Sequence, residues 1–305
     1  MASSWRSRIE VGKLTHSRQV VALRGGLGNQ LFQFSYALYL ARQGTRVHLD
    51  LSCVRHGAPA IFAVPLIGDR ARQMVLQATR FIPSPSGRLP QMGRLSRKVM
   101  RPGRIVLTES AQGPTPCSMV TPAWWFGYWQ RLSYAEAVIP LLRRGLAIEP
   151  SSQTAKRDQP AIARVHVRRG DYAGNPSELP ARWYRRAMDT VYLVGGDSVE
   201  TEVVTNDPQW CRRNLDFGRP FRILPTGPAL EDMRSLAASD FIVISRSTFS
   251  WWAAAISDAK VIAPKPWFPE MPPGEDQDLI PRKWLRLNCS ARCLPDYPGP
   301  WGSTS

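Results

Sequence analysis

The sequence predicts an α/β protein with two doubly wound domains that face a central cleft. Short β-branched runs alternate with segments of helical periodicity in both halves of the chain. A polar, proline-bounded stretch separates the two sets. The 305 residues, 43% of them hydrophobic, are enough for two cores. The expected parts are a lead over 1–19, an N-terminal domain over 20–150, a C-terminal domain over 151–285 and a tail over 286–305.

The first set opens with "VVALR" (20–24), an apolar run that predicts a short buried strand. The glycine turn "GGLGNQ" follows, and "LFQFSYALYLARQG" then repeats apolar residues at helical spacing up to a stop at Gly44. "TRVHLDLS" (45–52) predicts the next strand. A strand, glycine turn, helix and strand in this order indicate the opening of a parallel α/β domain.

The middle of the chain carries no clear periodicity. Residues 59–116 are rich in Pro, Gly, Arg and Ser, and we expect irregular helices and loops there. The aromatic run "PAWWFGYWQ" (122–130) follows them. We expect the linker between the domains at "EPSSQTAKRDQP" (149–160).

The second set again alternates strand and helix patterns, which indicates a second Rossmann-like domain. In order, it consists of the strand "AIARVHV", the helix "PARWYRRAMDTVYL", the strand "EVVTND", the helix "GPALEDMRSLAASD", the strand, turn and helix "FIVISRSTFSWWAAAI", and the strand "KVIAP".

Charge and cysteine content narrow the classes of partner. A net charge of +16 fits nucleic acid, an anionic membrane face or a phosphorylated substrate. The excess of arginine over lysine favours phosphate, although a GC-rich genome explains the surface arginines equally well. No apolar segment approaches the length of a membrane span, and residues 1–19 lack the apolar core of a secretory signal. Five scattered cysteines favour free thiols in a reduced cytoplasm over a zinc site.

The glycine turn "RGGLGNQ" is the first candidate ligand site. Gly25, Gly26 and Gly28 let the backbone approach a ligand, and the following helix directs amide donors at it. The spacing matches neither the dinucleotide fingerprint nor a Walker loop. On its own, such a turn is more often structural.

The second candidate, "HVRRGDY" (166–172), ends a strand where open α/β sheets present ligand-binding groups. Arg168 and Arg169 alternate in direction, so one of them is expected to face the cleft. A guanidinium there suits a pyrophosphate leaving group. The structural alternative is an Arg–Asp pair in which Asp171 caps the strand end. As a lone histidine, His166 is more often a packed core residue than a ligand.

The third candidate is "SRSTFSWW" (245–252), a strand end whose hydroxyls and helix-start amides suit phosphate. Its aromatic residues, Phe249 among them, fit the core better. "TND" (205–207) closes another strand, where it could cap the next helix. Asp232 lies early in a helix, where it either accepts from a guanine ring or favours the helix dipole.

Together, and in the same order, "GGLGNQLFQFSYA", "HVRRGDY" and "SDFIVISRSTFSWWAAAI" with "KVIAPKPWF" closely resemble the α-1,2-fucosyltransferase family, glycosyltransferase family eleven. "GYWQ" matches a family segment as well, and the resemblance spans about 20–268. It implies a GT-B-like architecture. The N-terminal domain then serves the acceptor, and the C-terminal domain holds GDP-fucose without a metal.

The resemblance also implies roles for single residues. Arg168, with Arg169 beside it, resembles the pair whose cleft-facing member neutralises the β-phosphate, and Asp171 matches the motif acid. His166 is similar to a residue that lines the nucleotide pocket, and Asp232 resembles the guanine-reading acid. The other implied donor-binding positions are Gly26, Gly28 and Asn29 in the N-terminal loop, Asn206 where the family has an acid, and Ser247, Thr248 and Phe249 in the phosphate loop.

Arg246 is a departure, because the family usually has Asn at this position. It adjoins the phosphate loop. The arginine therefore either adds a phosphate contact or points to a changed donor.

The resemblance implies a galactoside α-1,2-fucosyltransferase that moves L-fucose from GDP-β-L-fucose to O2 of a galactose, with inversion. We expect no metal or other cofactor. The expected partners are GDP-fucose and a galactose-terminated or lipid-linked glycan of the cell surface, but no nucleic acid. The expected location is the cytoplasm, with peripheral contact to the anionic inner face of the cell membrane.

Three alternatives stay open. One is a transferase on the same scaffold that uses another nucleotide-sugar donor. A second is a basic nucleic-acid-binding protein, although the dispersed arginines form no recognisable module. The third is a non-catalytic glycan-binding relative.

Overall fold

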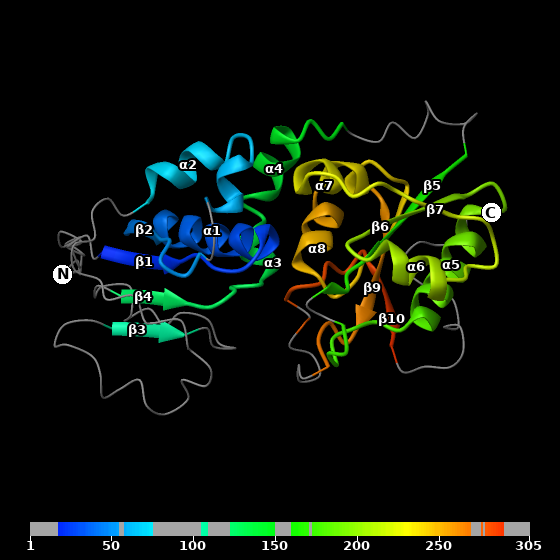
Figure 1. The fold of residues 1–305 in the computed structure, drawn as a ribbon. Coiled ribbons are helices and arrows are strands. Elements are labelled where there is room, and N and C mark those ends of the chain that lie inside the picture. The colour runs from blue at the N-terminus through cyan, green and yellow to red at the C-terminus, as the bar shows by residue number, and fades with distance from the viewer. Residues whose placement is uncertain are drawn as a thin grey trace, which may run out of the picture.

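The computed structural model describes residues 18–54, 58–75, 105–108, 123–149, 160–170, 173–269, 276 and 278–289. Two parallel sheets, each accompanied by helices, make up the two halves of the molecule (Figure 1). This arrangement confirms the expected α/β, GT-B-like fold class. Asp171 and most of residues 59–116 lie outside the described residues.

The first sheet has the strand order β2-β1-β4-β3, and all its neighbours pair in parallel. Its register places Val20 opposite both His48 and Trp124. The strands are β1 (Arg18–Ala22), β2 (Arg46–Asp50), β3 (Ile105–Thr108) and β4 (Ala123–Phe126). The helices of this half are α1 (Leu27–Arg42), the 3-10 helix η1 (Ala60–Ala63), α2 (Gly68–Gln73), α3 (Leu132–Ala135) and α4 (Ile139–Gly145).

Helix α1 begins earlier than the apolar spacing predicts. Gly26 is its N-cap, so Gly28 and Asn29 form part of its first turn. Gly25 precedes them at φ +74°, a left-handed conformation that glycine adopts without strain. The expected stop is confirmed, because Gly44 follows the helix at φ +79°.

The second sheet has the order β10-β9-β8-β5-β6-β7, again all parallel. Its strands are β5 (Ile162–Val167), β6 (Glu200–Thr205), β7 (Arg222–Ile223), β8 (Phe241–Val243), β9 (Lys260–Lys265) and β10 (Leu285–Asn288). Its helices are α5 (Ala181–Gly195), α6 (Pro208–Asn214), α7 (Ala229–Ala237) and α8 (Thr248–Ala255).

Two strands cross the expected boundaries of the domains. Strand β1 begins at Arg18, inside the expected lead, and β10 extends to Asn288, inside the expected tail. Of the expected linker, only Glu149 and Pro160 are described. The other boundaries stay predictions.

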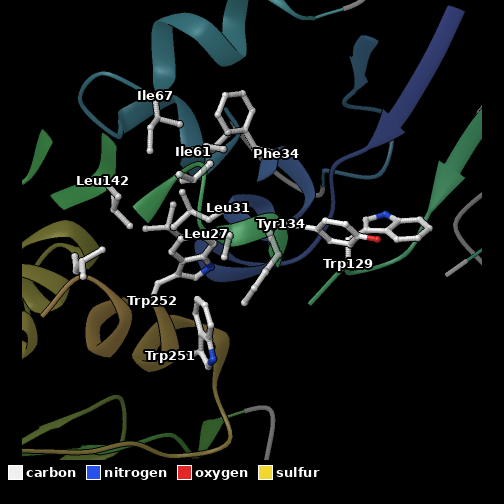
Figure 2. Packing of buried hydrophobic residues seen from close by; sticks show 14 of the residues in the cluster. Leu27, Leu31, Phe34, Ile61, Ile67, Trp129, Tyr134, Leu142, Trp251 and Trp252 are labelled. Carbon is white, nitrogen blue, oxygen red and sulfur yellow. The ribbon is translucent and has the colours of Figure 1, made fainter. Parts of the chain in front are cut away.

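The two halves share one apolar core. Phe32 of α1 lies against Trp251 and Trp252 of α8, with ring centroids 4.7 and 4.9 Å apart. Figure 2 shows these tryptophans gathered with Leu27 and Leu31 of α1. The interpretation of the tryptophans as core residues is therefore confirmed. A second cluster fills the space between α5 and the other side of the second sheet.

Candidate functional site

The carboxyl edges of both sheets meet where α1 touches α8. Helix α1 follows β1, helix α8 follows β8, and the two helices pack against each other near their amino-terminal ends. In Figure 1, the arrowheads of β1 and β4 point toward the second half. Ligand sites of parallel α/β sheets lie at such carboxyl edges.

Gly28 sets how closely the two helices approach. A Cβ atom at this position would lie 2.5 Å from the carbonyl carbon of Thr248 and 2.6 Å from the amide nitrogen of Phe249. The carbonyl oxygen of Gly28 accepts a hydrogen bond from Nε1 of Trp252 at 3.0 Å. Gly28 is therefore required for packing between the halves, whatever it contributes to ligand binding.

Asn29 joins three segments at this contact. Its Oδ1 accepts hydrogen bonds from Oγ1 of Thr248 at 3.0 Å and from Nε2 of Gln130 at 3.3 Å. Gln130 ends the "GYWQ" segment, directly after Trp129, whose φ is +55°. A tryptophan in this region is strained. The strained turn thus brings Gln130 to the contact between the two halves.

The start of α8 matches the expected phosphate loop in form. Ser247 is the N-cap in extended conformation, and its hydroxyl accepts from the amide of Phe249 at 3.3 Å. Neither α8 nor α1 has an acidic residue in its first turn. Two helix amino termini with partial positive charge therefore meet without a carboxylate in either first turn, an arrangement that favours an anion.

His166 lies buried beside this loop. Its Nδ1 is 2.8 Å from Oγ of Ser245, and its ring centroid is 5.5 Å from that of Phe249. Burial, together with the charge of Arg168, lowers the pKa of His166 to about 3. The imidazole is therefore neutral at physiological pH, so it can share a hydrogen bond but is a weak base.

The two adjacent arginines have different surroundings. The Arg169 guanidinium contacts the Glu178 carboxylate, lies 3.2 Å from Oδ2 of Asp207, and stacks 4.2 Å from the centroid of the Trp210 ring. Two carboxylates thus hold Arg169 in the protein framework. Arg168 is half-buried, and its charge acts on His166.

Asn206 holds the turn that carries the arginines. Its Oδ1 accepts from the Arg169 amide at 2.9 Å. Gly170 has φ +37°, and a Cβ there would lie 2.4 Å from Nδ2 of Asn206. Asn206 thus supports the backbone of the expected donor-binding turn. Asp171 is outside the described residues.

Asp232 lies in the first turn of α7, which packs against α8. Its Oδ1 accepts from the Gly227 amide at 3.3 Å. Burial raises the pKa of Asp232, and Glu231 adds to the rise while the Gly227 amide opposes it. The Asp232 carboxylate therefore holds the loop that precedes α7.

Arg246 contacts several loops of the second half through its guanidinium. It is only 5% exposed and donates to the carbonyl oxygens of Pro176 and Pro266 at 3.3–3.4 Å and toward Sγ of Cys289 at 3.3 Å. No carboxylate pairs with it among the residues described. Arg246 therefore ties together loops at the carboxyl edge of the second sheet.

Sequence reasoning missed the pair Arg24 and Tyr128. The Arg24 guanidinium carbon lies 4.3 Å from the centroid of the Tyr128 ring. Arg24 ends the run "VVALR" just before the glycine turn, and Tyr128 lies inside "GYWQ". Both positions stood next to recognised motifs, but their proximity depends on the pairing of β1 with β4.

The described residues offer neither a metal site nor a membrane span. No group of three or more His, Cys, Asp or Glu side chains able to hold a metal occurs among the described residues. No helix in that part of the chain is long and apolar enough to cross a membrane. Cys53, Cys211 and Cys289 are free thiols.

The model of the family "Glycosyl transferase family 11" matches residues 114–287. The chain belongs to this family. Family membership confirms the expected resemblance and makes the protein a glycosyltransferase of the fucosyltransferase type.

Three known proteins are similar to different lengths of the chain. An Escherichia coli α-1,2-colitosyltransferase is 26% identical over 293 residues, which are 88% of this chain and 98% of the relative. A galactoside 2-α-L-fucosyltransferase of Caenorhabditis elegans is 28% identical over 148 residues, 43% of this chain and 41% of the relative. The solved structure of NodZ α-1,6-fucosyltransferase soaked with GDP-fucose has a TM-score of 0.43 at 16% identity, covering 79% of this chain and 93% of NodZ.

Proposed function

We propose that this family 11 enzyme transfers L-fucose from GDP-β-L-fucose to O2 of a galactose residue, with inversion at the anomeric carbon. The observation that carries the proposal is the meeting of two helix amino termini, one from each half, on a strand edge that also bears Arg168. Such a site suits a diphosphate.

The leaving group is the part of the reaction that this site would stabilise. As the bond between fucose and the β-phosphate breaks, negative charge grows on GDP. Arg168 would neutralise that charge, and the amides at the start of α8 would donate to the phosphate oxygens. The proposal needs no metal, because fixed positive groups take the role of a cation.

The acceptor hydroxyl must lose a proton as it attacks. With a pKa of about 3, His166 is too weak a base to take it efficiently at neutral pH. We assign that role to Asp171, which directly follows the arginine turn. The acceptor oxygen then bonds to the anomeric carbon, GDP leaves, and the proton is held by the carboxylate.

We propose the remaining donor contacts for residues that lie near the carboxyl edge of the second sheet or at the start of α1. Asp232 is assigned to the guanine ring. His166 and Phe249, whose rings pack together, would line the nucleotide pocket. Gly26 at the exposed N-cap of α1 would lie over the diphosphate and sugar. Arg169 and Asn206 would act indirectly, by holding the turn that presents Arg168.

The proposed acceptor is a galactose-terminated or lipid-linked surface glycan. An Escherichia coli O-antigen biosynthesis glycosyltransferase, WbnK, is 30% identical over 117 residues, 34% of this chain and 38% of the relative. Transfer of a sugar to such a lipid-linked glycan fits a cytoplasmic enzyme at the inner membrane face. The net charge of +16 supports weak attraction to anionic lipid.

A second donor has a specific observation in its favour. The relative that matches over 98% of its own length is an α-1,2-colitosyltransferase. We therefore place the GDP-linked form of colitose beside GDP-fucose as a candidate donor.

Calorimetric titration with GDP, UDP and ADP in EDTA tests the proposal. We expect GDP to bind selectively, Arg168→Ala to remove most of the affinity, and Arg213→Ala, an exposed arginine of α6, to leave it unchanged. A turnover assay with GDP-fucose and GDP-colitose then decides the sugar. Equal binding of all three nucleotides, or full activity of Arg168→Ala, would refute the assignment.

A further inference from the structure

The pair formed by Arg24 and Tyr128 has no part in the proposed donor site. Arg24 follows β1 and Tyr128 follows β4, its parallel neighbour in the first sheet. Both residues lie at the edge of the sheet from which α1 runs to its contact with α8. The pair is thus next to the expected transfer site, on the half opposite the donor loops.

One buried side chain fixes the pair in place. Oε1 of Gln33 accepts from the Arg24 amide at 2.9 Å, while Nε2 of Gln33 donates to the carbonyl oxygen of Gly127 at 3.1 Å. Gln33 is fully buried. Because it ties both strand ends together, the backbone segments that carry the guanidinium and the ring are held next to each other before any ligand binds.

No carboxylate of the described residues balances the charge of Arg24, and its Nε is buried without a hydrogen-bond partner. Arg169, at the edge of the other sheet, has two carboxylates instead. Arg24 is half-buried, and a guanidinium whose charge no carboxylate compensates can form charge-assisted hydrogen bonds with an anionic ligand.

The exposed ring supplies the second part of the site. Tyr128 is 37% exposed, one of three large hydrophobic residues that reach this degree of exposure in the described part of the chain. An aromatic face packs well against the C–H face of a sugar ring, and a guanidinium fork matches a carboxylate or a phosphate.

We infer that Arg24 and Tyr128 form an acceptor subsite for a negatively charged sugar residue. The sugar ring would lie on Tyr128, and its carboxylate or phosphate would bind Arg24. The inference rests on the proposed function for the position of the acceptor. Carboxylate and phosphate present the same chemistry to the guanidinium, so the probes must separate them.

Three probes that differ only at C6 test the subsite. These are methyl β-galactoside, its C6 carboxylate (the galactosiduronate) and its 6-phosphate. Each is titrated against the full-length protein with and without saturating GDP, using the wild type, Arg24→Met, Tyr128→Ala and the control Arg42→Met. Arg42 is an exposed arginine in the last turn of α1, so this control removes the same charge from the same half.

At least one anionic probe should bind the wild type tenfold or more tighter than the neutral galactoside. The better of the two identifies the anion. Arg24→Met should reduce this ratio to about one, with GDP affinity and melting temperature retained, whereas Arg42→Met should keep the ratio. Tyr128→Ala should weaken all three probes.

Equal binding of the three probes, no binding of any, or a ratio that survives Arg24→Met would overturn the inference. Failure of the donor proposal gives a different pattern. In that case GDP does not bind selectively, yet the preference for an anionic probe persists without nucleotide and still depends on Arg24.

Discussion

At the scale of single residues, two neighbours of identical chemistry have different environments. Two carboxylates and a tryptophan ring hold Arg169, while Arg168 is half-buried next to a neutral histidine. The motif "HVRRGDY" predicts that one arginine faces the ligand, but not which one. That choice depends on Glu178 and Asp207, which come from other parts of the chain.

Replacing each arginine by alanine should therefore have separate effects. Arg168→Ala should lower kcat about a hundredfold, which corresponds to about 3 kcal/mol of lost transition-state stabilisation, and keep the melting temperature. Arg169→Ala leaves Glu178 and Asp207 without their cation, so it should lower the melting temperature as well. Steady-state kinetics and thermal denaturation of both variants check this. Equal melting temperatures in the two would contradict it.

His166 should make the protein less stable in weak acid. Its pKa is about 3 in the folded state and about 6.5 when unfolded, so the unfolded chain binds an extra proton between these values. Stability is therefore complete above about pH 6.5 and falls as the pH drops toward 3. Between pH 7 and 5 the loss should be about 2 kcal/mol.

Urea denaturation of the wild type and His166→Gln at pH 7 and pH 5 measures this difference. Glutamine keeps a hydrogen-bonding group for Ser245 but does not titrate. The variant should lose about 2 kcal/mol less than the wild type over this interval. Parallel losses in both proteins would show that the buried imidazole is not the cause.

At the scale of elements, the sequence predicts those strands and helices whose pattern is local. The run "VVALR" and the helix over 180–193 correspond to β1 and α5. Strands β3 and β10 are four residues long, and β7 has two. They become strands by pairing with neighbours that are distant in sequence, so no local periodicity reveals them.

The contact between α1 and α8 could not be predicted from periodicity either. "GGLGNQ" shows where a close approach is allowed, and "SRSTFSWW" shows a helix start, but neither indicates that the two meet. Their contact depends on how the two sheets are oriented. The sequence therefore predicts the single candidate residues, whereas only the structure shows which of them lie together.

Gly28→Ala should separate the two helices. The added Cβ would overlap the backbone of Thr248 and Phe249, so we expect a loss of about 2 kcal/mol in the free energy of unfolding. Gly26→Ala is the matched control for stability. It has negative φ and nothing within 4 Å of the added Cβ, so it should cost only the loss of a glycine N-cap, less than about 1 kcal/mol. Similar urea curves for both variants would contradict this reading of the contact.

At the scale of the whole molecule, the two sheets depend on one core. The cluster around Phe32, Trp251 and Trp252 takes residues from both halves, and the hydrogen bond from Trp252 to Gly28 crosses between them. Each half buries part of its apolar surface against the other, while a second cluster lies entirely within the C-terminal half. The sequence predicts two domains, and because they share this cluster around Phe32, Trp251 and Trp252 we expect them to unfold together.

Removing the central ring of this core should destabilise both halves together. Phe32→Ala should cost about 4 kcal/mol and keep a single unfolding transition. Leu193→Ala, in a leucine that is 71% exposed, should change stability by less than about 0.5 kcal/mol. Tryptophan fluorescence and far-ultraviolet circular dichroism should give the same midpoint in each protein. Two separate midpoints would mean that the halves unfold independently.

Because position 28 has no side chain, the distance between α1 and α8 is short and fixed. This distance sets the spacing between the strand end that carries Arg24 and the strand end that carries Arg168. A series of glycine, alanine and serine at this position would widen that gap in steps. Such a series would show how far the two substrates can be moved apart before sugar transfer stops and simple hydrolysis of the donor takes its place.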